Sequence, residues 1–256
     1  MKNSGYFGKR PLERDFVFDG LSAGLTDAWA GVMSDWLHSV QNELPHSWQR
    51  QYFEAPAWRF AIEPGLLGPS SWCGLLLACA DALGRSFPLT VLIPVTGAVD
   101  HLAFESAVDA VLDALEVRTM DFVEGTLSRK AFAGILAQQA ALLSSGPPPV
   151  ASSRAPVPLD AAEQALRIRF ARTGTDAIIA EDALVFSLER PPAPGLPLSY
   201  WWQDGSATRP PELCIWKGLP RGRETGGFFS GEWARFGWTR GQIDPGSPIR
   251  PWARGN

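Results

Sequence analysis

The chain has 256 residues, a formal net charge of −4 at pH 7 and a pI near 5.5. This balance argues against a general nucleic-acid binder or a binder of anionic membranes, because either needs a basic face. A hydrophobic share of 45% is ordinary for a globular protein with a substantial core. The N-terminus shows no signal peptide, and the longest apolar runs are too short to span a membrane. The three cysteines, at positions 73, 79 and 214, are typical of free thiols in a reducing compartment. We therefore expect a cytoplasmic protein without direct membrane insertion.

The first sixty residues predict an entry segment without a long element, two helices and the start of a sheet. Residues 6–17 place apolar residues around a charged centre and predict an entry segment laid across the core. From Ser22, apolar residues recur at three- and four-residue spacing, which predicts a helix that Pro45 ends. A short helix is expected over residues 48–53.

The stretch from Glu54 to Pro94 predicts the core of a sheet. Trp58, Phe60 and Ile62 alternate with smaller or charged residues, which is the period of a strand. The runs 72–80 and 87–95 are almost continuously apolar, as in strands covered on both faces. We therefore expect three adjacent strands.

The remaining chain predicts further helices and strands around this core. Apolar periodicity indicates helices over residues 104–115 and 129–143, and a Pro- and Ser-rich linker over residues 144–158. Beyond it we expect a helix over residues 159–172 with a basic surface, strands at 184–188, 198–202 and 213–216, and a short helix within 228–238. This order predicts an α/β or α+β fold with helices on the faces of a sheet. Residues 1–143 would form the main domain, and residues 159–256 would complete it or form a small subdomain.

The sequence carries no recognisable catalytic or metal-binding signature. The histidines, at positions 38, 46 and 101, are scattered, and neither Cys-x-x-Cys nor Gly-x-Ser-x-Gly occurs. No Gly-rich loop of a phosphate-binding type follows a strand. We assign no catalytic residue, cofactor or metal ion. A hydrolase using paired carboxylates stays open, because several acidic residues border apolar runs: Asp15, Glu54, Glu63, Asp81 and Asp204.

Two arginines, Arg59 and Arg85, lie within otherwise apolar segments. Each could pair with a nearby carboxylate, such as Glu63 or Asp81, and hold a turn together. Alternatively, each could contact a partner protein, because arginine and tryptophan dominate the energetics of interfaces. The same two interpretations apply to a segment near the end of the chain that contains Trp201, Trp202, Asp204 and Ser206.

Several short motifs share an order and spacing with one known family. They are Gly8-Lys9-Arg10-Pro11, Arg14-Asp15-Phe16-Val17, Trp29, Ala55-Pro56-Ala57-Trp58-Arg59-Phe60, Gly84-Arg85-Ser86-Phe87-Pro88-Leu89-Thr90 and Trp201-Trp202-Gln203-Asp204-Gly205-Ser206. Together they resemble TagF, a family of type VI secretion system-associated proteins of Gram-negative bacteria. The sequence departs from the expected small-residue-rich pattern at Arg10, Leu12 and Glu13.

The resemblance implies a non-enzymatic cytoplasmic regulator that represses assembly or firing of the secretion system after translation. It would act by binding a forkhead-associated scaffold protein and so oppose a threonine-phosphorylation pathway. Neither nucleic acid nor a cofactor is implied. The implied fold is a three-layer α/β sandwich, a mixed central sheet with helices on both faces. A structural subunit of the apparatus and, less favoured, a hydrolase are the alternatives.

Two groups of residues follow from this interpretation. Those expected to contact the partner are Arg59, Arg85, Trp201, Trp202, Asp204 and Ser206. Motif residues expected to be structural are Gly8, Lys9, Pro11, Asp15, Phe16, Trp58, Gly84 and Pro88.

Overall fold

The computed structural model describes residues 4–96, 99, 106–145, 163–172, 178–187, 197–206 and 209–241. Within these residues the strands are β1 Gly5–Gly8, β2 Val17–Asp19, β3 Trp58–Ile62, β4 Ser71–Leu77, β5 Leu89–Val95, β6 Glu163–Arg172, β7 Ile178–Ser187, β8 Leu198–Gln203, β9 Glu212–Lys217 and β10 Thr239–Gly241. The α-helices are α1 Ala23–Glu43, α2 Trp48–Phe53, α3 Ser106–Glu124, α4 Arg129–Ser145 and α5 Gly226–Ser230. Two short 3-10 helices are η1 Gly222–Thr225 and η2 Trp233–Phe236.

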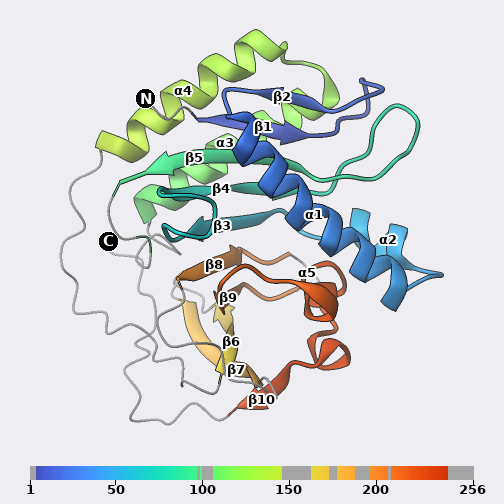
Figure 1. Ribbon diagram of the computed structural model, residues 1–256. Coiled ribbons are helices and arrows are strands. Elements are labelled where there is room, and N and C mark those ends of the chain that lie inside the picture. The colour runs from blue at the N-terminus through green and yellow to red at the C-terminus, as the bar shows by residue number, and fades with distance from the viewer. Residues whose placement is uncertain are drawn as a thin grey trace.

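The ten described strands form one sheet in the order β10-β7-β6-β9-β8-β3-β4-β5-β1-β2 (Figure 1). Every pairing between them is antiparallel. The expectation of a mixed sheet is therefore wrong for the described strands. The physical reason is connection length, because neighbours such as β3, β4 and β5 are joined by turns too short for a parallel crossover.

The predicted core strands are confirmed as β3, β4 and β5, which lie side by side in the sheet. Side chains of β4 alternate between two separate hydrophobic clusters. Cys73 and Leu75 belong to the cluster beneath α3 and α4, whereas Trp72 and Leu76 belong to the cluster beneath α1. Both faces are covered, so a nearly continuous apolar run is what this strand needs.

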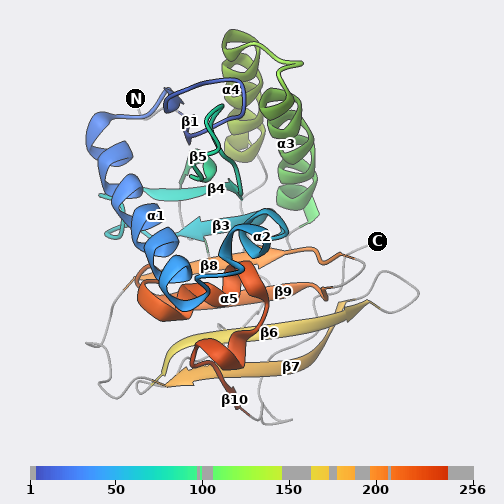
Figure 2. The same ribbon diagram turned by 90° about the vertical axis from the view of Figure 1, so that its right-hand side faces the viewer.

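Helices cover both faces of the N-terminal half of the sheet. Figure 2 shows α1 on one side of β3 and β4, and the pair α3 and α4 on the other. Trp29 and Trp36 of α1 are fully buried on the first face, and Leu112 of α3 and Phe132 of α4 on the second. An α/β fold is thus confirmed, whereas a three-layer sandwich along the whole sheet stays a prediction.

One expected helix is a strand. Residues 163–172 form β6, which pairs with β7 and β9. The sequence alternates with period two, so that Leu166 and Ile168 enter one hydrophobic cluster and Ala165 enters the other. The expected basic surface is also wrong for Arg167, which is buried and paired with Glu212 of β9.

Both ends of the described chain depart from the sequence expectations. The N-terminal segment forms a hairpin of the short strands β1 and β2 at one edge of the sheet, instead of an entry segment laid across the core. Near the other end, the expected helix within 228–238 is replaced by the end of α5 and by η2, and β10 follows from Thr239. Residues 146–158 of the expected linker lie outside the described residues, and α4 extends to Ser145. The sheet continues from β3 into β8, so strands after residue 159 join the same sheet as those before it.

Candidate functional site

Arg59 of β3 lies at the centre of a group of carboxylates. It is 3% exposed and points to the face that α3 covers, because Trp58 and Phe60 occupy the opposite face. Its guanidinium contacts three acidic side chains of α3: Nη1 lies 3.4 Å from Asp109 Oδ1, and Nη2 lies 2.5 Å from Asp113 Oδ1 and 3.5 Å from Glu116 Oε2.

A fourth carboxylate, Asp204 from the end of β8, also forms an ion pair with Arg59. We call Arg59, Asp109, Asp113, Glu116 and Asp204 the acidic cluster. With every member ionised, four carboxylates face one guanidinium, so the cluster has a formal charge of −3.

The order of residues on α3 and the register of the sheet create this arrangement. Asp109, Asp113 and Glu116 follow one another at i, i+4 and i+7, which places them on one side of the helix. Like charges at that spacing repel, so the buried cation opposite them is needed to offset the repulsion. Trp202 of β8 lies directly across from Arg59 in the sheet and donates its indole N–H to Asp109 over 3.3 Å.

The acids and the arginine respond to this site in different ways. Burial, followed by the charge of Asp204, raises the pKa of Asp109 to about 6. Burial likewise raises the pKa of Glu116. Burial alone would lower the pKa of Arg59, but the surrounding carboxylates, Asp204 first, outweigh it and raise that pKa. Arg59 therefore stays charged, and the four carboxylates around it all interact with this one positive charge.

A second polar group lies where the β1–β2 loop, residues 9–16, meets the β4–β5 turn, residues 78–88. We call this region the corner, and Figure 1 shows the two loops side by side at one end of the sheet. Asp81 lies at the centre of the corner. Its side chain accepts hydrogen bonds from the backbone N–H groups of Leu83 and Arg85, both over 2.9 Å. The carboxylate also pairs with Arg85 Nε over 2.7 Å and with Lys9 Nζ over 3.1 Å. Burial would raise the pKa of Asp81, but these donors outweigh it and hold the pKa well below its usual range.

Backbone contacts also join the two loops of the corner. Arg85 donates to the carbonyl of Arg14, and the amide of Ala82 donates to the carbonyl of Glu13 over 2.8 Å. At Gly8, a Cβ atom would lie 2.2 Å from the carbonyl oxygen of Pro88, so only glycine fits. The corner thus brings together two sequence motifs more than seventy residues apart.

Comparison with known families matches this part of the chain. The TagF N-terminal domain, described as type VI secretion system-associated, matches residues 5–139, more than half of the sequence. The chain belongs to the TagF family. This TagF protein is therefore associated with a type VI secretion system.

One solved structure resembles the TagF chain along nearly its whole length. The crystal structure of PA0076 from Pseudomonas aeruginosa PAO1 is 26% identical and superimposes with a TM-score of 0.59. The match covers 94% of this chain and 97% of that one. No protein with curated annotation matches the sequence.

The six TagF residues expected to contact a partner lie in four places. Arg59, Trp202 and Asp204 meet in the acidic cluster, whereas Arg85 lies at the corner. Trp201 points to the opposite face of the sheet, against Trp29 and Trp36 of α1. Ser206 follows β8.

Burial separates these six residues into two kinds. Arg59, Trp201 and Trp202 are buried, so they can only position other groups in this conformation. Arg85 and Ser206 are exposed, and Asp204 is partly exposed. Direct contact with a partner stays a prediction for these last three.

The expected arginine–carboxylate pairs have different outcomes. Arg85 pairs with Asp81, as that interpretation predicted. Arg59 pairs with α3 and Asp204 instead of Glu63, which accepts a hydrogen bond from the amide of Leu198 over 2.7 Å. Sequence reasoning missed the three α3 carboxylates, although their i, i+4, i+7 spacing was a readable signal.

The motif residues expected to be structural differ in their surroundings, and a structural role stays a prediction for the group. Lys9 lies over the ring of Phe16, which itself stacks on Phe7. Trp58 donates its indole N–H to the carbonyl of Phe228 over 3.0 Å. Gly84 has a φ of +77° in the tight β4–β5 turn, a conformation that favours glycine. Asp15 accepts a hydrogen bond from the amide of Phe16, and Pro11 lies exposed in the same loop. At Gly8 the chain passes close to the backbone of Pro88.

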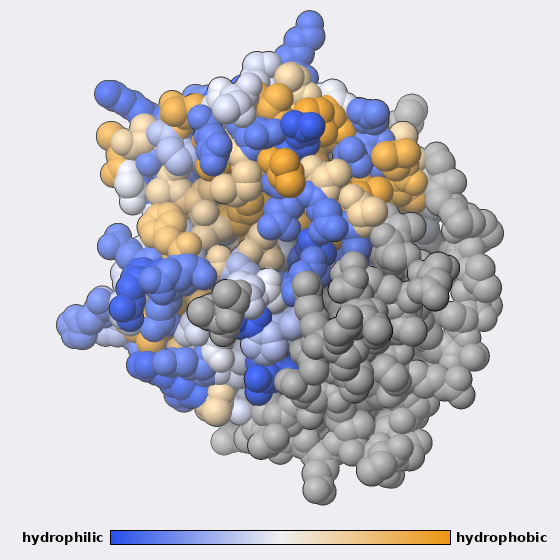
Figure 3. Space-filling view, turned by 180° about the vertical axis from the view of Figure 1, so that it is seen from behind, coloured by the Kyte–Doolittle hydropathy of each residue, from blue (hydrophilic) through white to orange (hydrophobic). Residues whose placement is uncertain are grey.

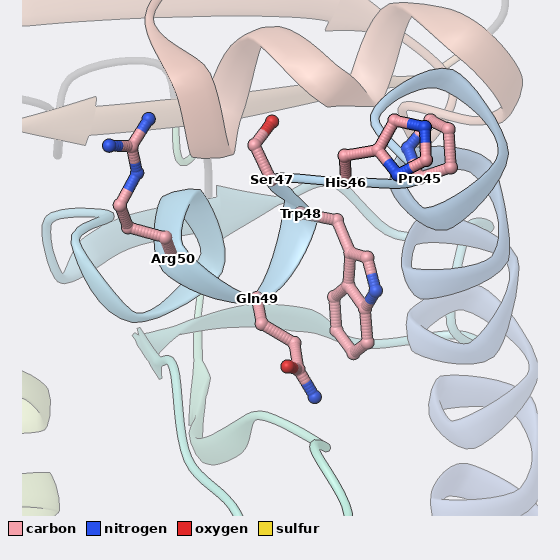
Figure 4. A pocket seen from close by; sticks show the side chains of 6 residues that line it. All are labelled: Pro45, His46, Ser47, Trp48, Gln49 and Arg50. Carbon is pink, nitrogen blue, oxygen red and sulfur yellow. The ribbon is translucent and has the colours of Figure 1, made fainter.

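A hollow near the junction of α1 and α2 is a weak candidate for a ligand site. It is lined by six consecutive residues, Pro45, His46, Ser47, Trp48, Gln49 and Arg50. Figure 4 shows their side chains pointing in different directions, so no polar set converges there. Among the described residues, no three acidic, histidine or cysteine side chains are grouped to hold a metal ion. No helix in the same residues is both long and apolar enough to cross a membrane.

Proposed function

We propose that this TagF protein is a non-enzymatic cytoplasmic regulator of its type VI secretion system. It represses assembly or firing after translation by binding a forkhead-associated scaffold protein. The observation that carries the proposal is the TagF N-terminal domain over residues 5–139, which includes the corner and most of the acidic cluster.

The contacts of the polar side chains support binding rather than catalysis. In the acidic cluster, the most strongly perturbed acid is Asp109, which is 4% exposed and held by Arg59 and Trp202. A general acid or base must reach the proton that it transfers, and this carboxylate is turned inward. At the corner, the donors around Asp81 favour its ionised form, as expected of a group that fixes two loops.

The test is direct binding between the purified chain and the forkhead-associated scaffold of the same system. We expect binding by isothermal titration calorimetry and reduced secretion when the chain is overproduced in its host. A folded chain that does not bind the scaffold would contradict the proposal. Co-sedimentation with assembled sheath or baseplate would instead favour a structural subunit.

Arg85 offers a test of the corner with a matched control. Its side chain is 57% exposed and ion-paired, and Arg223, at 56%, is ion-paired with Glu43 of α1, outside the corner. We expect Arg85→Ala to weaken scaffold binding and Arg223→Ala to leave it unchanged. Equal binding by both variants would remove Arg85 from the contact surface without affecting the proposed function.

A further inference from the structure

The outer side of α3 exposes apolar residues next to the acidic cluster. Val117 is 59% exposed and Met120 is 43% exposed, and they lie less than one turn apart. Ala110 and Ala114 extend this exposed side toward the start of the helix. Figure 3, which views the protein from the side opposite to Figure 1, shows hydrophobic and hydrophilic residues side by side on the coloured part of this surface.

Helical spacing joins this apolar side to the carboxylates. Asp113, Val117 and Met120 follow at i, i+4 and i+7, so they form one line along the helix surface. Asp113 belongs to the acidic cluster, yet its side chain is 60% exposed. We call the exposed residues Ala110, Asp113, Ala114, Val117 and Met120, together with the partly exposed Glu116, the α3 face.

The charge of the α3 face indicates the kind of partner that would cover it. Arg59 is already shared among four carboxylates, so the acidic cluster keeps a formal charge of −3, and two of its carboxylates, Asp113 and Glu116, lie on α3 beside the exposed apolar residues. Arginine is the cation that best complements clustered carboxylates, because its planar guanidinium donates two parallel hydrogen bonds. An arginine-rich surface with apolar parts would complement both components.

We propose that the α3 face docks on the arginine cluster with which the scaffold partner reads phosphorylated or acidic motifs. This inference rests on the proposed function. Forkhead-associated domains recognise phosphorylated and acidic motifs through arginine clusters. Bound there, the carboxylates of the α3 face occupy the place of a phosphothreonine, and Val117 and Met120 add buried apolar area. The protein would then compete directly with the phosphorylated ligand of the scaffold.

The experiment replaces two exposed apolar side chains of the α3 face with cations and leaves Arg59 unchanged. In the double variant Val117→Lys/Met120→Lys, lysines replace exposed side chains, and lysine is a better helix former than valine. The control is Phe53→Lys, which changes a 51% exposed apolar residue of α2, a helix outside the α3 face. Thermal unfolding of each variant verifies that it folds.

Binding of the full chain to the purified forkhead-associated scaffold is measured by calorimetry at low and at physiological salt. We expect the double variant to weaken binding about tenfold or more and Phe53→Lys to leave it unchanged. Wild-type binding should weaken as salt rises, because exposed charges are screened. A threonine-phosphorylated peptide that the scaffold binds should displace the wild-type chain.

The outcomes separate this inference from the proposed function. If the wild type binds the scaffold and the folded double variant binds equally well, the α3 face is not the docking surface. Wild-type binding that persists in the presence of saturating phosphopeptide would also overturn the inference. If the wild type does not bind the scaffold, the proposed function itself fails.

Discussion

Replacing Asp109 by asparagine should stabilise the protein above pH 6, although the change removes a partner of a buried arginine. The structure places the Asp109 carboxylate within the acidic cluster, where it is 4% exposed and competes with three other carboxylates for Arg59. Burial and the charge of Asp204 raise its pKa from 3.8 to about 6. Asparagine has nearly the same shape, stays neutral, and can still accept the indole N–H of Trp202 through its carbonyl oxygen.

The magnitude follows from linkage between protonation and folding. A rise in pKa from 3.8 to about 6 corresponds to about 3 kcal/mol, at about 1.4 kcal/mol for each pKa unit. Because folded Asp109 holds its proton more tightly than unfolded Asp109, its contribution to the unfolding free energy falls as pH rises from about 4 to about 6. The Asp109→Asn variant escapes this loss. We expect it to match the wild type near pH 4 and to exceed it by about 1–3 kcal/mol at pH 8.

The assay is urea unfolding of both proteins at pH 4 and pH 8, together with thermal unfolding. For a chain of this size, each kcal/mol should move Tm by about 2–4 °C. Asp113→Asn is the control, because its side chain is largely exposed and the change should stay within about 0.5 kcal/mol at both pH values. If Asp109→Asn is less stable than the wild type at pH 8, ionised Asp109 gains more from Arg59 than burial costs it. That result would refute the reasoning.

Three further changes test the packing around the two polar groups. Arg59→Met should lower the unfolding free energy by about 3–5 kcal/mol at pH 8, because it leaves the buried Asp109 and the carboxylates beside it without their cation; urea unfolding that shows a loss below 1 kcal/mol would contradict this. Tyr52→Phe should cost about 2 kcal/mol in the same assay, because the Tyr52 hydroxyl donates to the carbonyl of Cys79 over 2.9 Å and accepts from its amide over 3.0 Å. Gly8→Ala should lower Tm strongly or prevent soluble expression, because the new methyl group would overlap Pro88; an unchanged Tm would mean that the corner can move apart.

The central strands could be predicted because their pattern is local. In β3, Trp58, Phe60 and Ile62 alternate with smaller or charged residues because the two faces of the strand contact different hydrophobic clusters. In the same way, apolar residues spaced along α1 face one cluster and set the bounds of the helix within a few residues.

The strand β6 could not be assigned in this way, because the arginines in it obscured the alternation of apolar residues. Arginine has good helix propensity and is usually exposed, so a segment with three of them favoured a helix. In the fold, Arg167 is buried because Glu212 of β9 pairs with it and Trp233 lies 4.8 Å from its guanidinium. These two partners come from segments more than forty residues later in the chain, which no local pattern reveals.

The acidic cluster shows the same limit for the candidate site. Its components were visible separately: Arg59 within an apolar strand, Asp204 in a turn, and three acids at helical spacing. Their meeting depends on β8 pairing with β3 so that Trp202 lies across from Arg59, and on α3 covering that face. Sheet order is set by packing of the whole chain, so the cluster could be found only in the fold.

Two motifs of the TagF resemblance meet in this cluster, which changes what their residues imply about binding. Arg59 and Asp204 come from different motifs and pair with each other, and Arg59 also holds the carboxylates that α3 exposes. A variant of Arg59 that loses scaffold binding would therefore be ambiguous, because it releases buried charge and disturbs the α3 face together. Val117 and Met120 contribute no buried charge and are exposed, so changes there can alter docking while the cluster stays intact. Binding should accordingly be mapped first from the exposed side of α3, with the motif residues treated as its support.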